Sequence, residues 1–72
     1  MKSDDLVLRD TIRKNLIKCR TEKELTQLEL SKLIGKSSNA VASWEQGLSL
    51  PDVATLYKLS KLYDKKMEFF YE

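Results

Sequence analysis

Backbone breakers are almost absent from this chain, and their absence restricts its fold more than any other feature. Its 72 residues contain one proline and two glycines. Because Gly and Pro are the residues that most often interrupt regular structure, long linkers and low-complexity stretches are not expected. Apolar and polar residues never alternate long enough for a strand, whereas apolar residues recur at spacings of three and four. The pattern predicts an all-α fold with short connections.

Two helices are predicted in the first half of the chain. The first runs to about residue 22, with residues 1–11 as a short N-terminal extension, and its apolar stripe is Leu8, Ile12, Leu16 and Cys19. The second begins at Thr26, which forms a T-x-x-E capping box with Glu29. Gly35 is expected to end it in the left-handed conformation. Its predicted apolar face is Leu30, Leu33 and Ile34.

Three further helices are predicted in the second half. Ser37 caps a short third helix that ends near Gly47. Pro51 suits the first position of a fourth helix. The predicted core stripe of the fourth helix is Val53, Leu56, Leu59, Leu62 and Tyr63. A last short turn after Asp64 is expected to carry Met67 and Phe70 inward, which gives five helices in all.

Length and composition exclude several classes of protein. A chain of 72 residues is expected to form one domain. With one cysteine, Cys19, and no histidine, neither an internal disulfide nor a structural zinc site nor a Ser–His or Cys–His catalytic pair is expected. No apolar run exceeds three residues, so no membrane span is expected either. We therefore expect a cytoplasmic protein that is not an enzyme and has no cofactor.

Charge is distributed unevenly along the chain. Residues 1–36 hold nine basic and six acidic residues, net +3, and residues 58–72 hold four basic and three acidic, net +1. Residues 37–57 contain no Lys or Arg, and their two acidic residues, Glu45 and Asp52, give −2. Surfaces that bind DNA usually carry clustered basic charge. The predicted third helix instead has a short, uncharged polar face, which is typical of a reading or docking surface.

The segment LTQLELSKLIGKSSNAVASWEQG, from Leu25 to Gly47, carries a joint pattern that Pro51 extends. With this pattern, residues 12–71 resemble the helix-turn-helix family of phage Cro/CI-type and XRE-type regulators. The resemblance implies a compact five-helix, lambda-repressor-like domain over residues 1–72, with the helix-turn-helix at 26–46. The sequence departs from the family at Ser31, at Lys36 and in the loop of residues 48–50, where the family commonly carries Lys or Arg that bind phosphates.

The resemblance also implies a set of binding residues. Gln27 matches a glutamine that bonds a phosphate and supports the reading helix, and Ser37 combines its capping role with a phosphate contact. Ser38, Asn39 and Ser43 match positions that read base edges, and Ala42 fits a thymine methyl group. The alternative for these residues is a solvated polar face without a ligand.

One further pair has a structural role in the family. Arg20 and Glu45 match residues that form an ion pair between the first helix and the end of the third. The resemblance implies that this pair fixes the position of the reading helix. Removing one partner of such a pair leaves the other charge without compensation.

Two functions remain open, both as a transcriptional regulator of a temperate-phage-type switch in a bacterial host cell. The first is sequence-specific binding of operator DNA, with two copies on adjacent half-sites. The second is antirepression, in which the domain docks on a cognate helix-turn-helix repressor and blocks its DNA face through an apolar rim of Leu48 and Leu50. An antitoxin-type regulator would share the fold. A homodimer through the terminal aromatic residues Phe69 and Tyr71 is a further hypothesis.

Overall fold

Helices account for almost all of the regular structure in the computed structural model, which describes residues 2–72 but not the side chains of residues 2 and 3. The described part contains four α-helices and one 3-10 helix: α1 (Lys2–Glu22), α2 (Gln27–Ile34), α3 (Ser38–Glu45), α4 (Val53–Tyr63) and η1 (Met67–Tyr71). The predicted all-α class is confirmed for these residues. The fifth predicted helix is a 3-10 helix rather than an α-helix.

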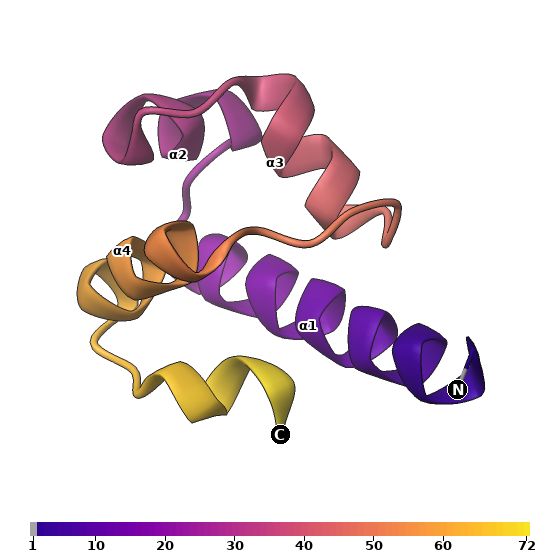
Figure 1. Cartoon of the computed structure of the whole chain (residues 1–72). Coiled ribbons are helices and arrows are strands. Elements are labelled where there is room, and N and C mark those ends of the chain that lie inside the picture. The colour runs from indigo at the N-terminus through magenta and orange to yellow at the C-terminus, as the bar shows by residue number, and fades with distance from the viewer. Residues whose placement is uncertain (1) are drawn as a thin grey trace.

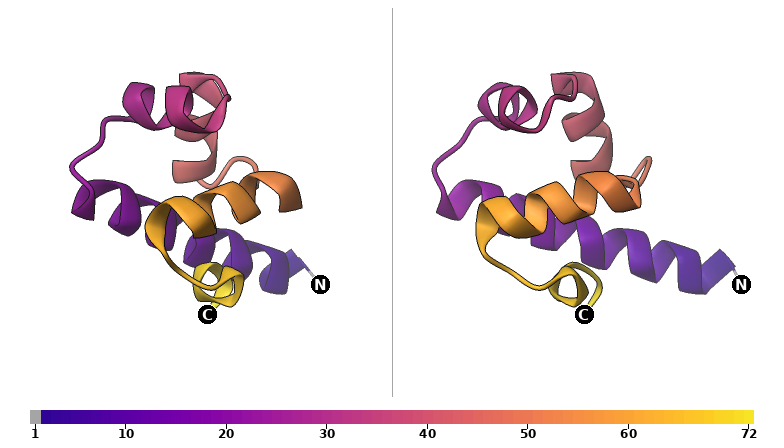
Figure 2. Two further views of the ribbon diagram at one scale, coloured as in Figure 1. Left: turned by 90° about the vertical axis from the view of Figure 1, so that its left-hand side faces the viewer. Right: turned by 60° about the vertical axis from the view of Figure 1, so that its left-hand side comes forward.

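The long helix α1 organises the other elements around it. It packs against α3 on one side and against η1 on the other, while α2 contacts α3 and α4 (Figure 1). The two turned views show the same arrangement, with α2 and α3 together at one end of the molecule and η1 at the opposite end (Figure 2). The N-terminal end of α1 extends past the other elements. The α2–α3 unit is thus held on a scaffold made by α1, α4 and η1.

Local capping explains where α2 begins and ends. The Thr26 hydroxyl accepts a hydrogen bond from the Glu29 backbone N–H at 3.0 Å, and the Glu29 carboxylate accepts one from the Thr26 N–H at 2.8 Å. The predicted capping box is therefore confirmed. Gly35 ends the helix with φ at 69°, a left-handed conformation that costs glycine little because it has no Cβ.

The start of α4 differs from the prediction. Asp52, not the residue before Pro51, is the N-cap, and its carboxylate accepts a hydrogen bond from the Thr55 N–H at 2.8 Å. Pro51 is buried and precedes the helix. Because α4 begins at Val53, this residue lies on its first turn with 74% of its surface exposed, so its predicted place in the core is wrong.

The core is made by one face of each helix. Two further predicted core residues, Leu8 and Leu33, are 39% and 59% exposed. Leu8 lies in the N-terminal half of α1, and α2 buries its face at Leu30 and Ile34, which leaves Leu33 outside. The buried apolar residues are Ile12, Leu16, Cys19, Leu30, Ile34, Val41, Trp44, Leu56, Leu59, Tyr63 and Phe70.

The C-terminal 3-10 helix is fixed to α1 by one side chain. The Asn15 amide nitrogen donates to the Phe69 and Phe70 carbonyl oxygens at 3.1 and 3.0 Å. Phe70 is fully buried, and Met67 packs against the core as predicted. Among residues 2–72, no helix is both long and apolar enough to cross a bilayer.

Candidate nucleic-acid interface

The short helices α2 and α3 form a unit joined by the turn at residues 35–37. Ser37 is the N-cap of α3, and its hydroxyl accepts a hydrogen bond from the Ala40 backbone N–H at 3.1 Å. Val41 and Trp44 are buried beneath α3, so that the opposite side of this helix faces outward. This arrangement presents one short helix at the surface of the molecule, supported from below by a second helix.

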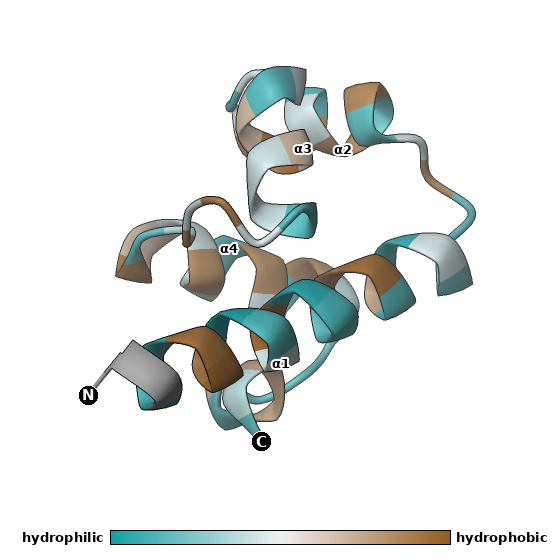
Figure 3. Cartoon of the chain, turned by 90° about the vertical axis from the view of Figure 1, so that its right-hand side faces the viewer, coloured by the Kyte–Doolittle hydropathy of each residue, from teal (hydrophilic) through white to brown (hydrophobic). Residues whose placement is uncertain are grey.

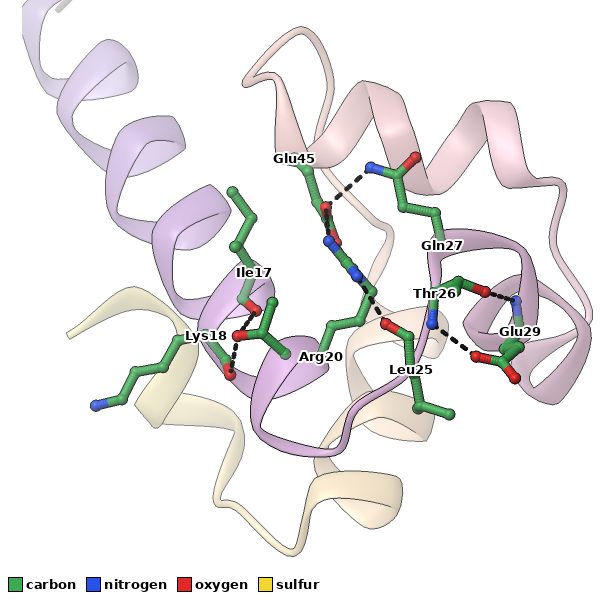
Figure 4. A network of polar contacts seen from close by, with 9 residues as sticks. Ile17, Lys18, Arg20, Leu25, Thr26, Gln27, Glu29 and Glu45 are labelled. Carbon is green, nitrogen blue, oxygen red and sulfur yellow. Dashed lines mark hydrogen bonds and ion pairs between the residues drawn. The ribbon is translucent and has the colours of Figure 1, made fainter.

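A buried polar network holds the C-terminal end of α3 (Figure 4). The Arg20 guanidinium of α1 donates to both carboxylate oxygens of Glu45, at 2.7 and 2.9 Å, and to the Leu25 carbonyl oxygen at 2.7 Å. The two side chains are 15% and 5% exposed. The hydrogen bond to Glu45 raises the pKa of Arg20 further above its already high value. The ion pair that the family resemblance implied is thus present and bidentate.

Gln27 belongs to the same network. Its side-chain amide nitrogen donates to Glu45 at 3.0 Å, which links the first residue of α2 to the last residue of α3 (Figure 4). The side chain is therefore engaged within the protein and supports α3 from beneath. Its amide oxygen is an acceptor and cannot bond a phosphate, whereas the second hydrogen of its amide nitrogen remains a donor. The predicted phosphate contact stays a prediction.

The outward side of α3 contains the predicted base-reading residues. Asn39 is exposed, and Ser38, Ala42 and Ser43 are half-buried. The Ser43 hydroxyl lies 2.7 Å from the Ser49 hydroxyl in the connection that follows α3. Its hydrogen-bonding capacity is thus shared with this neighbour, and Asn39 is the most accessible of the four side chains. We call these four residues the α3 surface.

Leucines border the α3 surface where the chain leaves the helix. Leu48 is 66% exposed and Leu50 is 40% exposed, and Val53 continues the apolar stretch at the start of α4. The connection between α3 and α4 includes apolar residues and runs beside the N-terminal half of α1 (Figure 3). The rim predicted from the sequence is therefore exposed and apolar.

Two arginines from α1 join this border, and the charge map along the sequence did not locate them there. Arg9 donates from Nη1 to the Leu48 carbonyl oxygen at 3.1 Å. Arg13 lies across Gly47, with its Cδ 3.3 Å from the position that a Cβ would occupy there. The spacing of four residues on one helix predicts that Arg9 and Arg13 share a face, but no local signal indicates that this face meets residues 47–48.

The described residues include no metal-binding group, and two further reactive side chains lie in the core. No group of three or more Cys, Asp or Glu side chains in residues 2–72 is arranged to hold a metal ion. Cys19 is buried in the core, and burial raises the pKa of its thiol, which disfavours the reactive thiolate. The Tyr63 hydroxyl is buried without a hydrogen-bond partner among the described residues. These groups belong to the core and lie outside the α3 surface.

Comparison with known proteins agrees with this geometry. The chain is 34% identical over 55 residues to an uncharacterized HTH-type transcriptional regulator, YqaE, of Bacillus subtilis (strain 168), a match that covers 76% of this chain and 47% of that protein. Its structure resembles the crystal structure of an HTH_3 family transcriptional regulator from Vibrio cholerae, with a TM-score of 0.80 and 25% identity. That likeness covers 93% of this chain and 38% of the other. The chain thus spans less than half the length of either protein.

The family assignment rests on a sequence profile that covers most of the chain. The sequence profile of the helix-turn-helix family HTH_3 matches residues 16–70, which include α2, α3, α4 and both partners of the Arg20–Glu45 ion pair. The match leaves about the first four turns of α1, with Arg9 and Arg13, outside the family pattern. The chain belongs to the helix-turn-helix family HTH_3.

Proposed function

We propose that this lambda-repressor-like domain regulates transcription by binding DNA through the α3 surface, as part of a genetic switch of the temperate-phage type. One observation carries the proposal: α3 stands at the surface with a short, uncharged outer side while the Arg20–Glu45–Gln27 network fixes its C-terminal end. In helix-turn-helix proteins the second helix of the unit lies in the major groove with its N-terminal residues on base edges. Asn39, near the start of α3, is suited to this position.

The relatives support the same function. Both are named as transcriptional regulators, and both are longer than this chain. Two copies of the domain would reach half-sites about 34 Å apart on one face of the duplex. Asparagine can bond adenine at N6 and N7 in a bidentate pair, so Asn39 is assigned one adenine in each half-site.

The DNA hypothesis is tested by selection of binding sites from a randomised duplex pool. Asn39→Ala is expected to lose discrimination at one base pair, at a cost of about 1–3 kcal/mol there, with the remaining positions unchanged. Thr21→Ala, which truncates an exposed polar residue at the far end of α1, serves as the control and should leave every position unchanged. Retention of full discrimination by Asn39→Ala would exclude the assigned contact.

A second candidate function is antirepression, and the apolar rim favours it. Leu48 and Leu50 are exposed beside an α3 surface that has no Lys or Arg of its own, which is the composition of a protein contact rather than of a DNA contact. The domain would dock on the DNA-reading helix of a cognate repressor. Asp52, which is exposed, is complementary in sign to the basic surface of such a partner.

Repressor binding is tested with candidate helix-turn-helix repressors from the source cell. Leu48→Asp and Asn39→Arg are expected to abolish the complex while the helical circular dichroism stays unchanged, because both residues are exposed. Leu33→Asp changes a leucine of similar exposure on α2 and should leave binding intact. If the wild-type chain binds a selected duplex and no repressor, antirepression is wrong and DNA binding stands.

A further inference from the structure

The N-terminal half of α1 lies against the connection that leaves the α3 surface, and it places an arginine there. Arg9 is half-buried and donates one hydrogen bond, from Nη1 to the Leu48 carbonyl oxygen at 3.1 Å. A guanidinium has five N–H donors in a planar fork. The contact with Leu48 therefore orients the side chain and leaves donors for an external acceptor. Figure 3 shows α1 and this connection side by side.

Arg13 extends the basic charge along the same face of α1. Gly47 has no side chain, and a Cβ there would stand 3.3 Å from the Arg13 Cδ, so the glycine leaves room for the arginine to lie across the connection. The Arg13 guanidinium also pairs with Asp10 at 2.7 Å, and Asp10 pairs with Lys14 at 2.9 Å. With three basic residues and the single carboxylate of Asp10, residues 9–14 of α1 have a net charge of +2. Asp4 and Asp5 lie at least one turn nearer the N-terminus.

The position of these arginines matters because residues 37–57 contain no Lys or Arg. A helix in the major groove has a sugar–phosphate strand on each side, and contacts with phosphates fix the register of a protein on the duplex. On the side of the α3–α4 connection, residues 46–52 contain no Lys or Arg. The cations on that side come from α1, across 39 residues of sequence between Arg9 and Leu48.

We propose that Arg9, with Arg13 behind it, binds a DNA phosphate beside the α3–α4 connection and so replaces the basic loop that this chain lacks. The proposal rests on the DNA-binding function proposed above. Arginine suits the site because its planar fork matches phosphate oxygens. Both residues precede the family match at residues 16–70, so the family profile does not include them.

The salt dependence of DNA affinity tests the contact. The probe is a fluorescein-labelled duplex recovered from a randomised pool by the wild-type chain, and binding is followed by anisotropy between 50 and 200 mM KCl. Each lost phosphate contact makes the slope of log Kobs against log salt shallower by about 0.9. Arg9→Gln is expected to show this change, with base preference unaltered, and Arg9→Lys is expected to retain most of the slope.

Lys66→Gln provides the matched control, since it removes the same charge from an exposed residue beyond the far end of α4. Its slope should equal that of the wild type. If the wild-type chain binds the duplex and Arg9→Gln keeps the wild-type slope, or if Lys66→Gln changes the slope as much, the phosphate contact is wrong and the DNA function stands. If the wild-type chain recovers no duplex at any salt concentration, the DNA function and the contact fail together.

Discussion

The polar network under α3 gives a quantitative prediction for Glu45→Ala. The substitution removes two hydrogen bonds from Arg20, at 2.7 and 2.9 Å, and one from Gln27 at 3.0 Å. It leaves the Arg20 guanidinium, whose side chain is 15% exposed, with the Leu25 carbonyl oxygen as its hydrogen-bond partner. Removing one partner of a buried ion pair costs about 3–5 kcal/mol, chiefly because the remaining charge is uncompensated.

That loss is large for a domain of this size. At about 0.05–0.15 kcal/mol per residue, a chain of 72 residues has a free energy of unfolding of about 4–11 kcal/mol. Glu45→Ala is therefore expected to lower the midpoint of urea unfolding strongly. It should also reduce the melting temperature by at least about 12 °C, since 1 kcal/mol corresponds to about 4–8 °C in small domains.

A double-mutant cycle separates the pair from its surroundings. Arg20→Ala in the Glu45→Ala background should cost much less than in the wild type, with a coupling energy of about 2 kcal/mol or more. The surface pair Asp10–Lys14, whose side chains are 45% and 65% exposed, is the control and should show a coupling near zero. Losses for Arg20 and Glu45 that add within about 0.5 kcal/mol would refute the argument.

Two further predictions concern pH and a buried hydroxyl. Hydrogen bonds from Thr26 and Thr55 lower the pKa of Glu29 and of Asp52, respectively, in the folded state. The two carboxylates therefore stabilise the fold above pH ~4, and this stabilisation is lost as the pH falls through their lowered pKa values. Asp52→Asn should accordingly reduce the difference in melting temperature between pH 7 and pH 3. An unchanged difference would contradict the stabilising role of the Asp52 carboxylate as the N-cap of α4. Burial raises the pKa of Tyr63 to about 12, and its hydroxyl has no partner among the described residues. Tyr63→Phe should thus leave the free energy of unfolding unchanged or raise it by about 1 kcal/mol, whereas a loss of more than that would reveal a partner.

Local features of the fold were predictable because their causes lie within a few residues of each other. The capping box of Thr26 and Glu29 spans three residues, and the left-handed end of α2 needs a glycine at Gly35. The periodicity of apolar residues correctly predicts which residues of a helix are buried wherever a neighbouring element covers that helix. Leu8 was wrongly assigned to the core because periodicity identifies an apolar face without indicating how far along the helix that face is covered.

Some features of the candidate site were predictable from the sequence, and others were not. The residues on the outward side of α3 were predictable from their helical spacing and from the family resemblance, and the structure gives Asn39 the greatest exposure among the four. The bond between Ser43 and Ser49 was not predictable, because it depends on the path of the connection after α3.

Sequence by itself determined the all-α class, the caps of α2, the N-cap of α3 and the identity of the helix that stands at the surface, because helix formation and capping depend on contacts three and four residues apart. Tertiary structure decided which distant groups meet. Arg9 reaches Leu48 across 39 residues, and Asn15 reaches the Phe70 carbonyl oxygen across 55. Such contacts depend on how the helices pack around α1, and no periodic or local pattern encodes that packing. The basic charge beside the α3 surface is therefore a product of the fold.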